Sequence, residues 1–160
     1  YMLLCCGFSE YAIGLYHLVN HAFFKALLFL TAGNIIHSLS GEQDIRKMGG
    51  LSKILPATYS LFFLGSLSLM GIPFLSGFFS KDFIIEIVVG SYSLVSNFSQ
   101  LLIIFVTSLT AFYSTRLLIL IFLGTPRGYR QVYYLGHESS NLMLQPLLLL
   151  AFGAIFSGYF

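Results

Sequence analysis

HLVNHAFFK, residues 17–25, lies in the middle of an apolar run that extends from residue 11 to residue 37. This run is long enough to cross a bilayer, because a transmembrane helix needs about 20 apolar residues. It nevertheless carries His17, His21 and Lys25, each four residues from the next. On an α-helix each step of four residues advances by about 40°, so the three side chains line one face over roughly 12 Å of axis.

Ionisable groups on such a helix are costly. A charge near the bilayer centre costs at least about 2.5–3.5 kcal/mol, and such residues usually face the protein interior or a water-filled cavity. Taken singly, each residue has a simpler explanation, because lysines near helix ends snorkel to the headgroups and histidines can be satisfied core groups. Three such groups on one face instead indicate a helix that handles protons or ions.

The composition predicts an all-α integral membrane protein. The chain is 57% hydrophobic and only 9% charged, whereas soluble domains average about 25% charged residues. Its apolar runs are long, unlike the alternating segments of about ten residues in a membrane β-barrel. The net charge of +2 comes without a clustered basic face, so nucleic acid is not an expected partner. Cys5 and Cys6 are adjacent, and no metal-ligand spacing or GxGxxG loop occurs, so we expect no metal or cofactor in this chain.

Apolar runs and helix breakers divide the chain into seven segments. These are the end of a preceding span (1–10), a transmembrane helix with the His/Lys face (11–38), a basic loop (39–55), a discontinuous transmembrane helix (56–90), a transmembrane helix (97–123), a loop (124–145) and the start of a further transmembrane helix opened by Pro146 (146–160). Because both chain ends fall inside apolar runs, we expect the chain to be part of a larger subunit.

Residues 56–90 are too many for one straight crossing and too few for two crossings with a loop. Their middle reads LMGIPFLSGFFSKDF, and Pro73 removes a backbone hydrogen bond and crowds the preceding turn. We therefore expect a helix broken inside the membrane, with Lys81 and Asp82 near the break. Broken helices build ion sites in transporters, because freed carbonyl groups and helix ends carry partial charge.

Basic residues support one broken crossing. The loops 40–55 and 124–145 hold five of the eight Lys and Arg residues, whereas residues 90–97 hold none. A single crossing over 56–90 places both basic loops on one side of the membrane, which is the matrix-like or cytoplasmic side by the positive-inside rule.

The charged residues near the break do not form an obvious pair. Asp82 and Glu86 share a helix face, whereas Lys81 points about 100° away from Asp82. Lys81 can therefore face a lysine or histidine elsewhere, and the two carboxylates can equally belong to a solvated helix end. Lys25 and Lys81 are the candidates for a proton relay, because the charge state of a buried lysine depends on its partners.

Four stretches of the chain resemble a known family in the same order. They are HLVNHAFFKALLFL (17–30), EQDIRKMGGL (42–51), GSLSLMGIPFLSGFFSKDFIIE (65–86) and SLTAFYSTRLL (108–118). These closely resemble the antiporter-like, proton-pumping chain 5 family of NADH–ubiquinone oxidoreductase, respiratory complex I, of the mitochondrial type. The resemblance weakens in 87–100 and 124–145. It implies an antiporter-like helix bundle with two inverted five-helix units, of which this C-terminal-half fragment supplies most of the second.

The resemblance also implies roles for particular residues. Lys25 matches the proton-path lysine, with His17 and His21 lining the same path. Lys81 matches the lysine at the helix break on the exit side, and Asp82 follows it in the SKD motif. The function implied for this multi-pass protein is proton translocation across the mitochondrial inner membrane, coupled to NADH oxidation and ubiquinone reduction elsewhere in the complex.

The same resemblance implies where the other components lie. NADH, flavin, iron–sulfur clusters and ubiquinone are expected in other subunits. The expected partners are the other membrane-arm subunits, the N-terminal part of the same subunit, and lipids.

Two other functions compete with this interpretation. Subunits of multisubunit cation/proton antiporters share HxxxHAxFK-like and DIRKxGGL-like motifs, although the SGFFSKD and YSTR stretches favour complex I. The other alternative is a structural membrane scaffold without ion transfer. The presence of all four ionisable residues, His17, His21, Lys25 and Lys81, argues against it.

Overall fold

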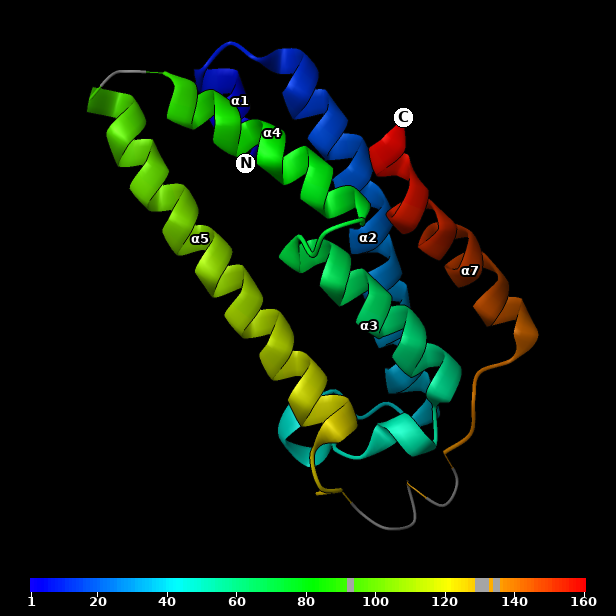
Figure 1. Cartoon of the computed structure of the whole chain (residues 1–160). Coiled ribbons are helices and arrows are strands. Elements are labelled where there is room, and N and C mark those ends of the chain that lie inside the picture. Colours follow the sequence, from blue (N-terminus) through cyan, green and yellow to red (C-terminus); the bar gives the residue numbers. More distant parts are fainter. Residues whose placement is uncertain (92–93, 129–132, 134–135) are drawn as a thin grey trace.

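The computed structural model describes the chain except for residues 92–93, 129–132 and 134–135, and the described part is built from helices (Figure 1). In chain order the elements are α1 (Met2–Gly7), α2 (Tyr11–Ser38), the short 3₁₀ turns η1 (Ile45–Lys47) and η2 (Leu51–Lys53), α3 (Pro56–Met70), α4 (Ser76–Gly90), α5 (Leu94–Leu118) with its π-helical end η3 (Ile119–Leu123), and α7 (Asn141–Phe156) with its 3₁₀ end η4 (Ser157–Tyr159). No strand occurs among the described residues, so the predicted all-α class is confirmed.

Helix α2 forms the centre of the bundle. It contacts α1, α3, α4 and α7, and Figure 1 shows α5 and α7 on opposite sides of the pair α3 and α4. The core around α2 includes Phe24 and Leu27, which are fully buried against α3 and α7. His17 is also buried on this helix, and His21 packs against Phe24, so the core of the bundle adjoins the His/Lys face.

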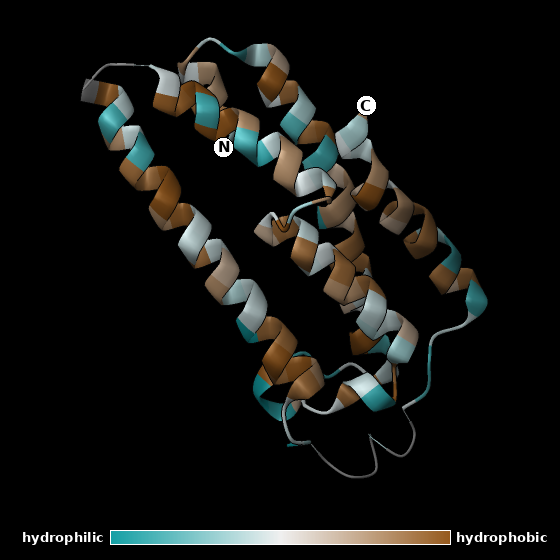
Figure 2. Cartoon of the chain, viewed as in Figure 1, coloured by the Kyte–Doolittle hydropathy of each residue, from teal (hydrophilic) through white to brown (hydrophobic). Residues whose placement is uncertain are grey.

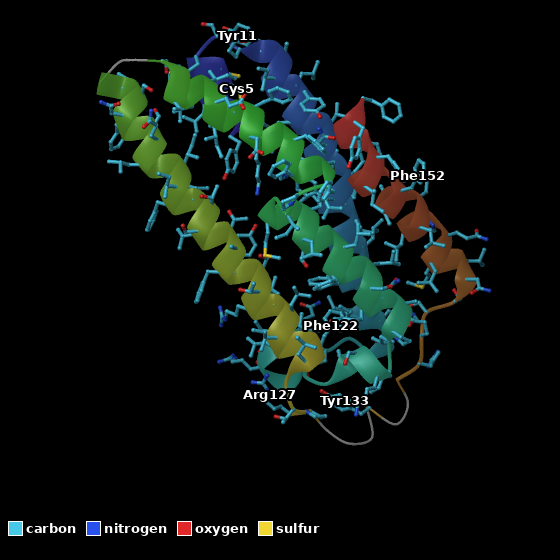
Figure 3. All side chains as sticks on the ribbon, in the orientation of Figure 1. Cys5, Tyr11, Phe122, Arg127, Tyr133 and Phe152 are labelled. Carbon is cyan, nitrogen blue, oxygen red and sulfur yellow. The ribbon has the colours of Figure 1, made fainter. Side chains whose placement is uncertain are left out.

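Three helices in the described part of the chain are long and apolar enough to cross a membrane: Tyr11–Ser38, Val95–Leu123 and Asn141–Tyr159. Figure 2 shows hydrophobic residues along much of α5 and most of α7, and hydrophilic residues gathered in the loops at one end. Large apolar side chains on the outer faces are exposed, including Phe112 on α5 and Phe152, which projects away from α7 in Figure 3. Such extended apolar surfaces suit contact with lipid or with further helices.

The discontinuous helix is formed by α3 and α4. Gly71 ends α3 in the left-handed conformation, with φ of 85°. Its N–H donates to the carbonyl oxygen of Ser68 at 3.2 Å, and the next N–H, of Ile72, donates to Leu67 at 3.1 Å, which is a Schellman-type helix end. Each half has 15 residues and is therefore about 22 Å long, short of the roughly 30 Å of a bilayer core. The predicted break within residues 56–90 is confirmed.

The two half-helices cross at very close range. A Cβ atom on Gly77 would lie 1.8 Å from the carbonyl oxygen of Ser68, so no larger residue fits there without moving a backbone. Beside this contact the hydroxyl oxygens of Ser68 and Ser76 lie 3.3 Å apart. The first turn of α4 therefore rests directly on the last turn of α3, and this contact fixes the position of the residues that follow.

The two basic loops lie together at one end of the molecule. A Cβ atom on Gly49 would lie 2.2 Å from the carbonyl oxygen of Thr125, and one on Gly50 would lie 2.9 Å from the Pro126 ring. Figure 3 places Arg127 at the same end. The two loops therefore lie at one end of the molecule, as a single broken crossing over 56–90 requires; Arg130, also counted in that prediction, lies outside the described residues.

Exposed ion pairs occur within the first of these loops. Arg46 Nε lies 3.1 Å from Asp44 Oδ1, and this hydrogen bond lowers the pKa of the Asp44 carboxyl. Lys47 Nζ lies 3.3 Å from Glu42 Oε2. Exposed pairs of this kind contribute little stability, whereas Met48, Leu51 and Leu55 of the same loop are buried in the hydrophobic core.

A side chain from the second loop caps the broken helix. The carboxylate of Glu138 accepts a hydrogen bond from the Ala57 N–H at 3.0 Å and another from the Thr58 hydroxyl. A carboxylate at a helix N-terminus satisfies free N–H groups and complements the helix dipole. Sequence reasoning did not identify this cap, because the residues lie far apart in the chain.

Two predicted helix starts are wrong. The helix predicted to begin at residue 97 begins at Leu94, because the buried Ser96 hydroxyl donates to the Val88 carbonyl of α4 and holds an additional turn. The last helix begins at Asn141 rather than at Pro146. Its first turn is closed by the Ser140 carbonyl, which accepts from the N–H groups of residues 143 and 144. Pro146 therefore sits inside the helix, and α7 starts five residues earlier than predicted.

Candidate functional site

Lys81 is buried at the helix break. Its side chain is 5% exposed, and its ammonium group donates a hydrogen bond to the carbonyl oxygen of Leu69 in the last turn of α3. In a continuous helix this carbonyl would accept from the residue four positions later, which is Pro73 and has no N–H. Gly71 ends the helix, and Pro73 offers no N–H to the Leu69 carbonyl, so this acceptor is available to the lysine. The C-terminal end of α3 also carries negative partial charge, which favours a cation.

His17 lies next to this lysine on the neighbouring helix α2. Its ring is 2% exposed, and its Nδ1 is 2.9 Å from the Oγ of Ser80, the residue before Lys81. The Tyr1 ring packs beside both groups, with its centroid 5.5 Å from the His17 ring and 5.6 Å from Lys81 Nζ. His17 and Lys81 are thus brought into one cluster by the crossing of α2 and α4.

His21 extends the cluster by one helical turn. Its ring centroid is 5.8 Å from that of His17, and it packs edge-on against Phe24 at 5.0 Å. Lys25 follows one turn later on the same face, as its spacing predicts. The face therefore carries an uninterrupted series of ionisable groups from the break towards the middle of α2.

Lys25 is half-buried and has a different environment. Its Nζ lies 5.2 Å from the centroid of the Phe29 ring, and the side chain lines a cavity of about 140 Å³ between α2, α3 and α5. Leu69, whose carbonyl binds Lys81, also lines this cavity. The other polar residues on its wall are Ser66, Tyr113 and Ser114. The cavity thus extends from one lysine to the residue that binds the other.

Asp82 lies outside the cluster. It is half-buried on α4, and no hydrogen bond or ion pair joins it to any other described residue. Glu86 lies one turn further along the same face and is exposed. Lys81 therefore pairs with a backbone carbonyl instead of its neighbouring carboxylate.

The arrangement supplies groups that accept and release protons. Imidazole, ammonium and hydroxyl groups follow one another from Lys25 to Lys81, and the inner members are shielded from water. Among the described residues, no three His, Cys, Asp or Glu side chains gather in the geometry of a metal site. The cluster therefore contains a buried lysine whose hydrogen-bond acceptor is a neutral carbonyl. Beside it are two imidazole rings that can each bind a proton.

Comparison with known proteins shows what the chain is similar to. Residues 1–112, more than half of the chain, match the family described as NADH:quinone oxidoreductase/Mrp antiporter, transmembrane. The chain belongs to this family. The matched region contains every residue of the cluster, so the predicted resemblance and the antiporter-like fold are confirmed for the part that holds the site.

Individual members of this family are highly similar to the chain. The proteins named NADH-ubiquinone oxidoreductase chain 5 of Metridium senile, Allomyces macrogynus and Phytophthora infestans are 52%, 50% and 52% identical to it. Each alignment covers 99% of this chain but only 26%, 25% and 24% of the respective relative. The chain therefore spans about a quarter of the length of these curated relatives, and it is a membrane-embedded member of the family.

Three partners in the site were missed by sequence reasoning: Ser80, Tyr1 and the Leu69 carbonyl. Ser80 stands directly before Lys81, but its contact with His17 joins residues 63 positions apart. The free carbonyl had a signal, because a proline always leaves the carbonyl four residues earlier without its helix donor. In this chain the Leu69 carbonyl accepts the hydrogen bond of the buried Lys81.

Proposed function

We propose that this chain is part of a membrane subunit of respiratory complex I that translocates protons across the mitochondrial inner membrane. The names of its relatives and their identity of about 50% over nearly the whole chain support this proposal. As a subunit of NADH:ubiquinone reductase it carries no redox site of its own. NADH, flavin, iron–sulfur clusters and ubiquinone belong to other subunits, whose reaction supplies the energy.

One observation carries the proposal: a lysine with almost no exposure is held by a carbonyl and not by a carboxylate. A buried carboxylate would fix the positive charge, because an ion pair in low dielectric stabilises the charged form of both partners. A carbonyl dipole stabilises the ammonium group less, so a modest change in the surrounding field can release the proton. Lys81 is therefore suited to bind and release a proton in each cycle.

The remaining residues form a route to this position. Lys25 takes up a proton from the cavity that it lines, and His21 and His17 relay protons along the same face of α2. Ser80 connects His17 to the start of α4, because its hydroxyl can both donate and accept a hydrogen bond. A change of charge elsewhere in the complex then shifts the proton occupancy of Lys81. Asp82 would act on this site only through its charge.

The partners follow from the same proposal. The exposed apolar faces of α5 and α7 would contact the N-terminal part of the same subunit, neighbouring membrane-arm subunits and lipid. A cation/proton antiporter subunit belongs to the same family, but the chain 5 relatives favour complex I. Purification of the native assembly separates these alternatives, because only complex I contains subunits with flavin and iron–sulfur clusters.

The test is Lys81→Met in the full-length subunit within its native complex. Methionine fills the same space without an ionisable group, so we expect assembly near the wild-type level and at least about a tenfold loss of proton translocation per electron. Lys53→Met is the matched control, because Lys53 is exposed in the first basic loop. Proton uptake and quinone reduction are measured together in sealed vesicles. Full pumping by Lys81→Met would contradict the proposal.

A further inference from the structure

Asn20 is a fully buried polar residue that the proposed route does not use. It lies on α2 between His17 and His21. Its Oδ1 accepts a hydrogen bond from the Ser157 hydroxyl at 2.6 Å, whereas its Nδ2 has no partner among the described residues. A buried donor without an acceptor loses its hydration and gains nothing in return. A water molecule is small enough to satisfy such a group where other polar atoms are near.

Polar atoms near Asn20 come from the turn η4 and the start of α4. Ser157 begins this turn, and a Cβ atom on the following Gly158 would lie 2.7 Å from the Cα of Ser76. The turn also reaches the helix break, because the Tyr159 hydroxyl donates to the Phe74 carbonyl at 3.1 Å. Ser76 is one helical turn before Ser80, which contacts His17. The residue after Ser157 and the His17 ring thus both contact the first turns of α4, at Ser76 and Ser80.

An open cavity lies beyond this turn. It has a volume of about 410 Å³ and is lined by residues 12, 13 and 16 of α2, by Phe83 and by residues 158–160. The Tyr16 hydroxyl donates to the Gly158 carbonyl at 2.7 Å on its wall. Because α2 begins at the end away from the basic loops (Figure 1), the cavity lies in the half of the molecule opposite those loops.

We propose that Asn20 is a positioning residue of the proton route, whose amide holds a water molecule between the Ser80–His17 pair and this open cavity. The inference rests on the proposed function. Nδ2 donates to the water oxygen, and Ser157 fixes the orientation of the amide by bonding Oδ1. The water then accepts a proton on its free lone pair and donates one of its other protons to the next acceptor along the route. The Asn20 amide therefore does not change its charge. Each transfer moves one proton from an O–H or N–H group to the next lone pair.

A simpler role for Asn20 is to join α2 to η4 by its hydrogen bond. The chain offers a matched control for that role in Asn34. This residue is also buried on α2, with an Nδ2 that has no partner among the described residues. It lies about four helical turns further along, towards the basic loops. Loss of a buried amide therefore disturbs the same helix in both variants, but only Asn20 adjoins the proposed route.

The experiment compares Asn20→Leu, Asn34→Leu and Lys81→Met in the full-length subunit within its native complex. For Asn20→Leu we expect proton translocation to slow by about fivefold at an unchanged rate of electron transfer. Asn34→Leu is expected to pump like the wild type, and Asn20→Ser to recover most of the loss, because a hydroxyl can hold the same water. Equal losses at both asparagines, or none at Asn20, would overturn the inference.

Two further variants, Ser157→Ala and Lys81→Met, separate a failure of the role of Asn20 from a failure to assemble and from a failure of the proposed function. If Asn20→Leu fails to assemble, Ser157→Ala decides, because it leaves the amide in place but frees its orientation. We then expect a partial loss of pumping, and an unchanged proton yield overturns the inference. If Lys81→Met pumps fully, the proposed function itself fails. If Lys81→Met is impaired while Asn20→Leu pumps normally, only the role of Asn20 is rejected.

Discussion

Lys81 and Lys25 are both lysines within apolar helices, but the fold gives them different surroundings. Lys81 stands at the start of a half-helix, is 5% exposed and donates to a backbone carbonyl. Lys25 stands in the uninterrupted helix α2, is half-buried and lies over the Phe29 ring beside a cavity. Lys81 thus has a backbone carbonyl as its hydrogen-bond acceptor, whereas Lys25 has an aromatic ring and a cavity beside it.

The difference follows from what each helix does with its carbonyl groups. In the interior of an α-helix such as α2 each carbonyl has the N–H four residues later as its donor, so no carbonyl there is left without a helix partner. A cation–π contact contributes only about 0.5–2 kcal/mol, so the Phe29 ring is a weak partner for Lys25. At the break, Pro73 leaves a carbonyl free, and the close crossing of the half-helices delivers Lys81 to it. A helix break is thus a means of building a defined cation site in a membrane.

The largest effect is expected at Gly77, where the two half-helices cross and bring Lys81 to its carbonyl ligand. Gly77→Ala places a Cβ atom on the Ser68 carbonyl oxygen, where the available distance is 1.8 Å. Relief requires the half-helices to separate, which costs at least about 3 kcal/mol, the upper part of the usual range for overpacking. We expect little assembled complex, measured as the amount of intact complex in membranes and its thermal midpoint.

Gly33→Ala is the control for this change. Gly33 also lies within a helix, but nothing stands within 4 Å of the position of its Cβ. Alanine stabilises a helix interior by up to about 1 kcal/mol relative to glycine, so assembly should be unchanged. Normal assembly and wild-type thermal stability of Gly77→Ala would show that α3 and α4 do not cross as closely as described.

Lys25→Arg tests whether the lysine beside the cavity must release its proton. Arginine keeps the charge but does not deprotonate in proteins, and the cavity of about 140 Å³ can receive its larger head group. We expect normal assembly and about a tenfold loss of proton translocation per electron, measured in sealed vesicles beside Lys53→Arg. If Lys25→Arg pumps like the wild type, Lys25 supplies only a fixed charge, and the two lysines differ in function as well as in surroundings.

Sequence patterns predicted the helix break and the shared face of α2, but not the hydrogen bond that holds Lys81. The break at Gly71 and Pro73 and the shared face of His17, His21 and Lys25 are local properties, so helical periodicity predicts them. The hydrogen bond from Lys81 to α3 depends on how two helices cross, which no periodicity records. The start of α5 was misplaced for a related reason, since the Ser96 hydroxyl bonds the Val88 carbonyl of the preceding helix; α7 instead gained a turn closed locally by the Ser140 carbonyl.

Pro73→Ala restores an N–H that can compete for the Leu69 carbonyl. The effect should be smaller than that of the preceding changes, because Gly71 has already turned the chain away in the left-handed conformation. We expect about a threefold loss of proton translocation, equivalent to less than 1 kcal/mol, with normal assembly. Pro56→Ala is the control, because a proline in the first turn removes no helical hydrogen bond. A larger loss in Pro56→Ala than in Pro73→Ala would assign the effect to helix stability and not to the free carbonyl.

The two carboxylates beyond the cluster, Asp82 and Glu86, give the smallest expected effects and complete the comparison. The Asp82 carboxylate has no partner among the described residues, and it lies beyond the cluster, so it reaches Lys81 only through the field of its charge. Asp82→Asn removes that charge and should lower proton translocation by about twofold at most, and Glu86→Gln, one turn further away, should have less effect still. The measurement is the proton yield per electron at normal assembly. A loss as large as that of Lys81→Met would place Asp82 directly on the route, because a neutral amide of the same shape differs from the carboxylate in little but its charge and its ability to take up a proton.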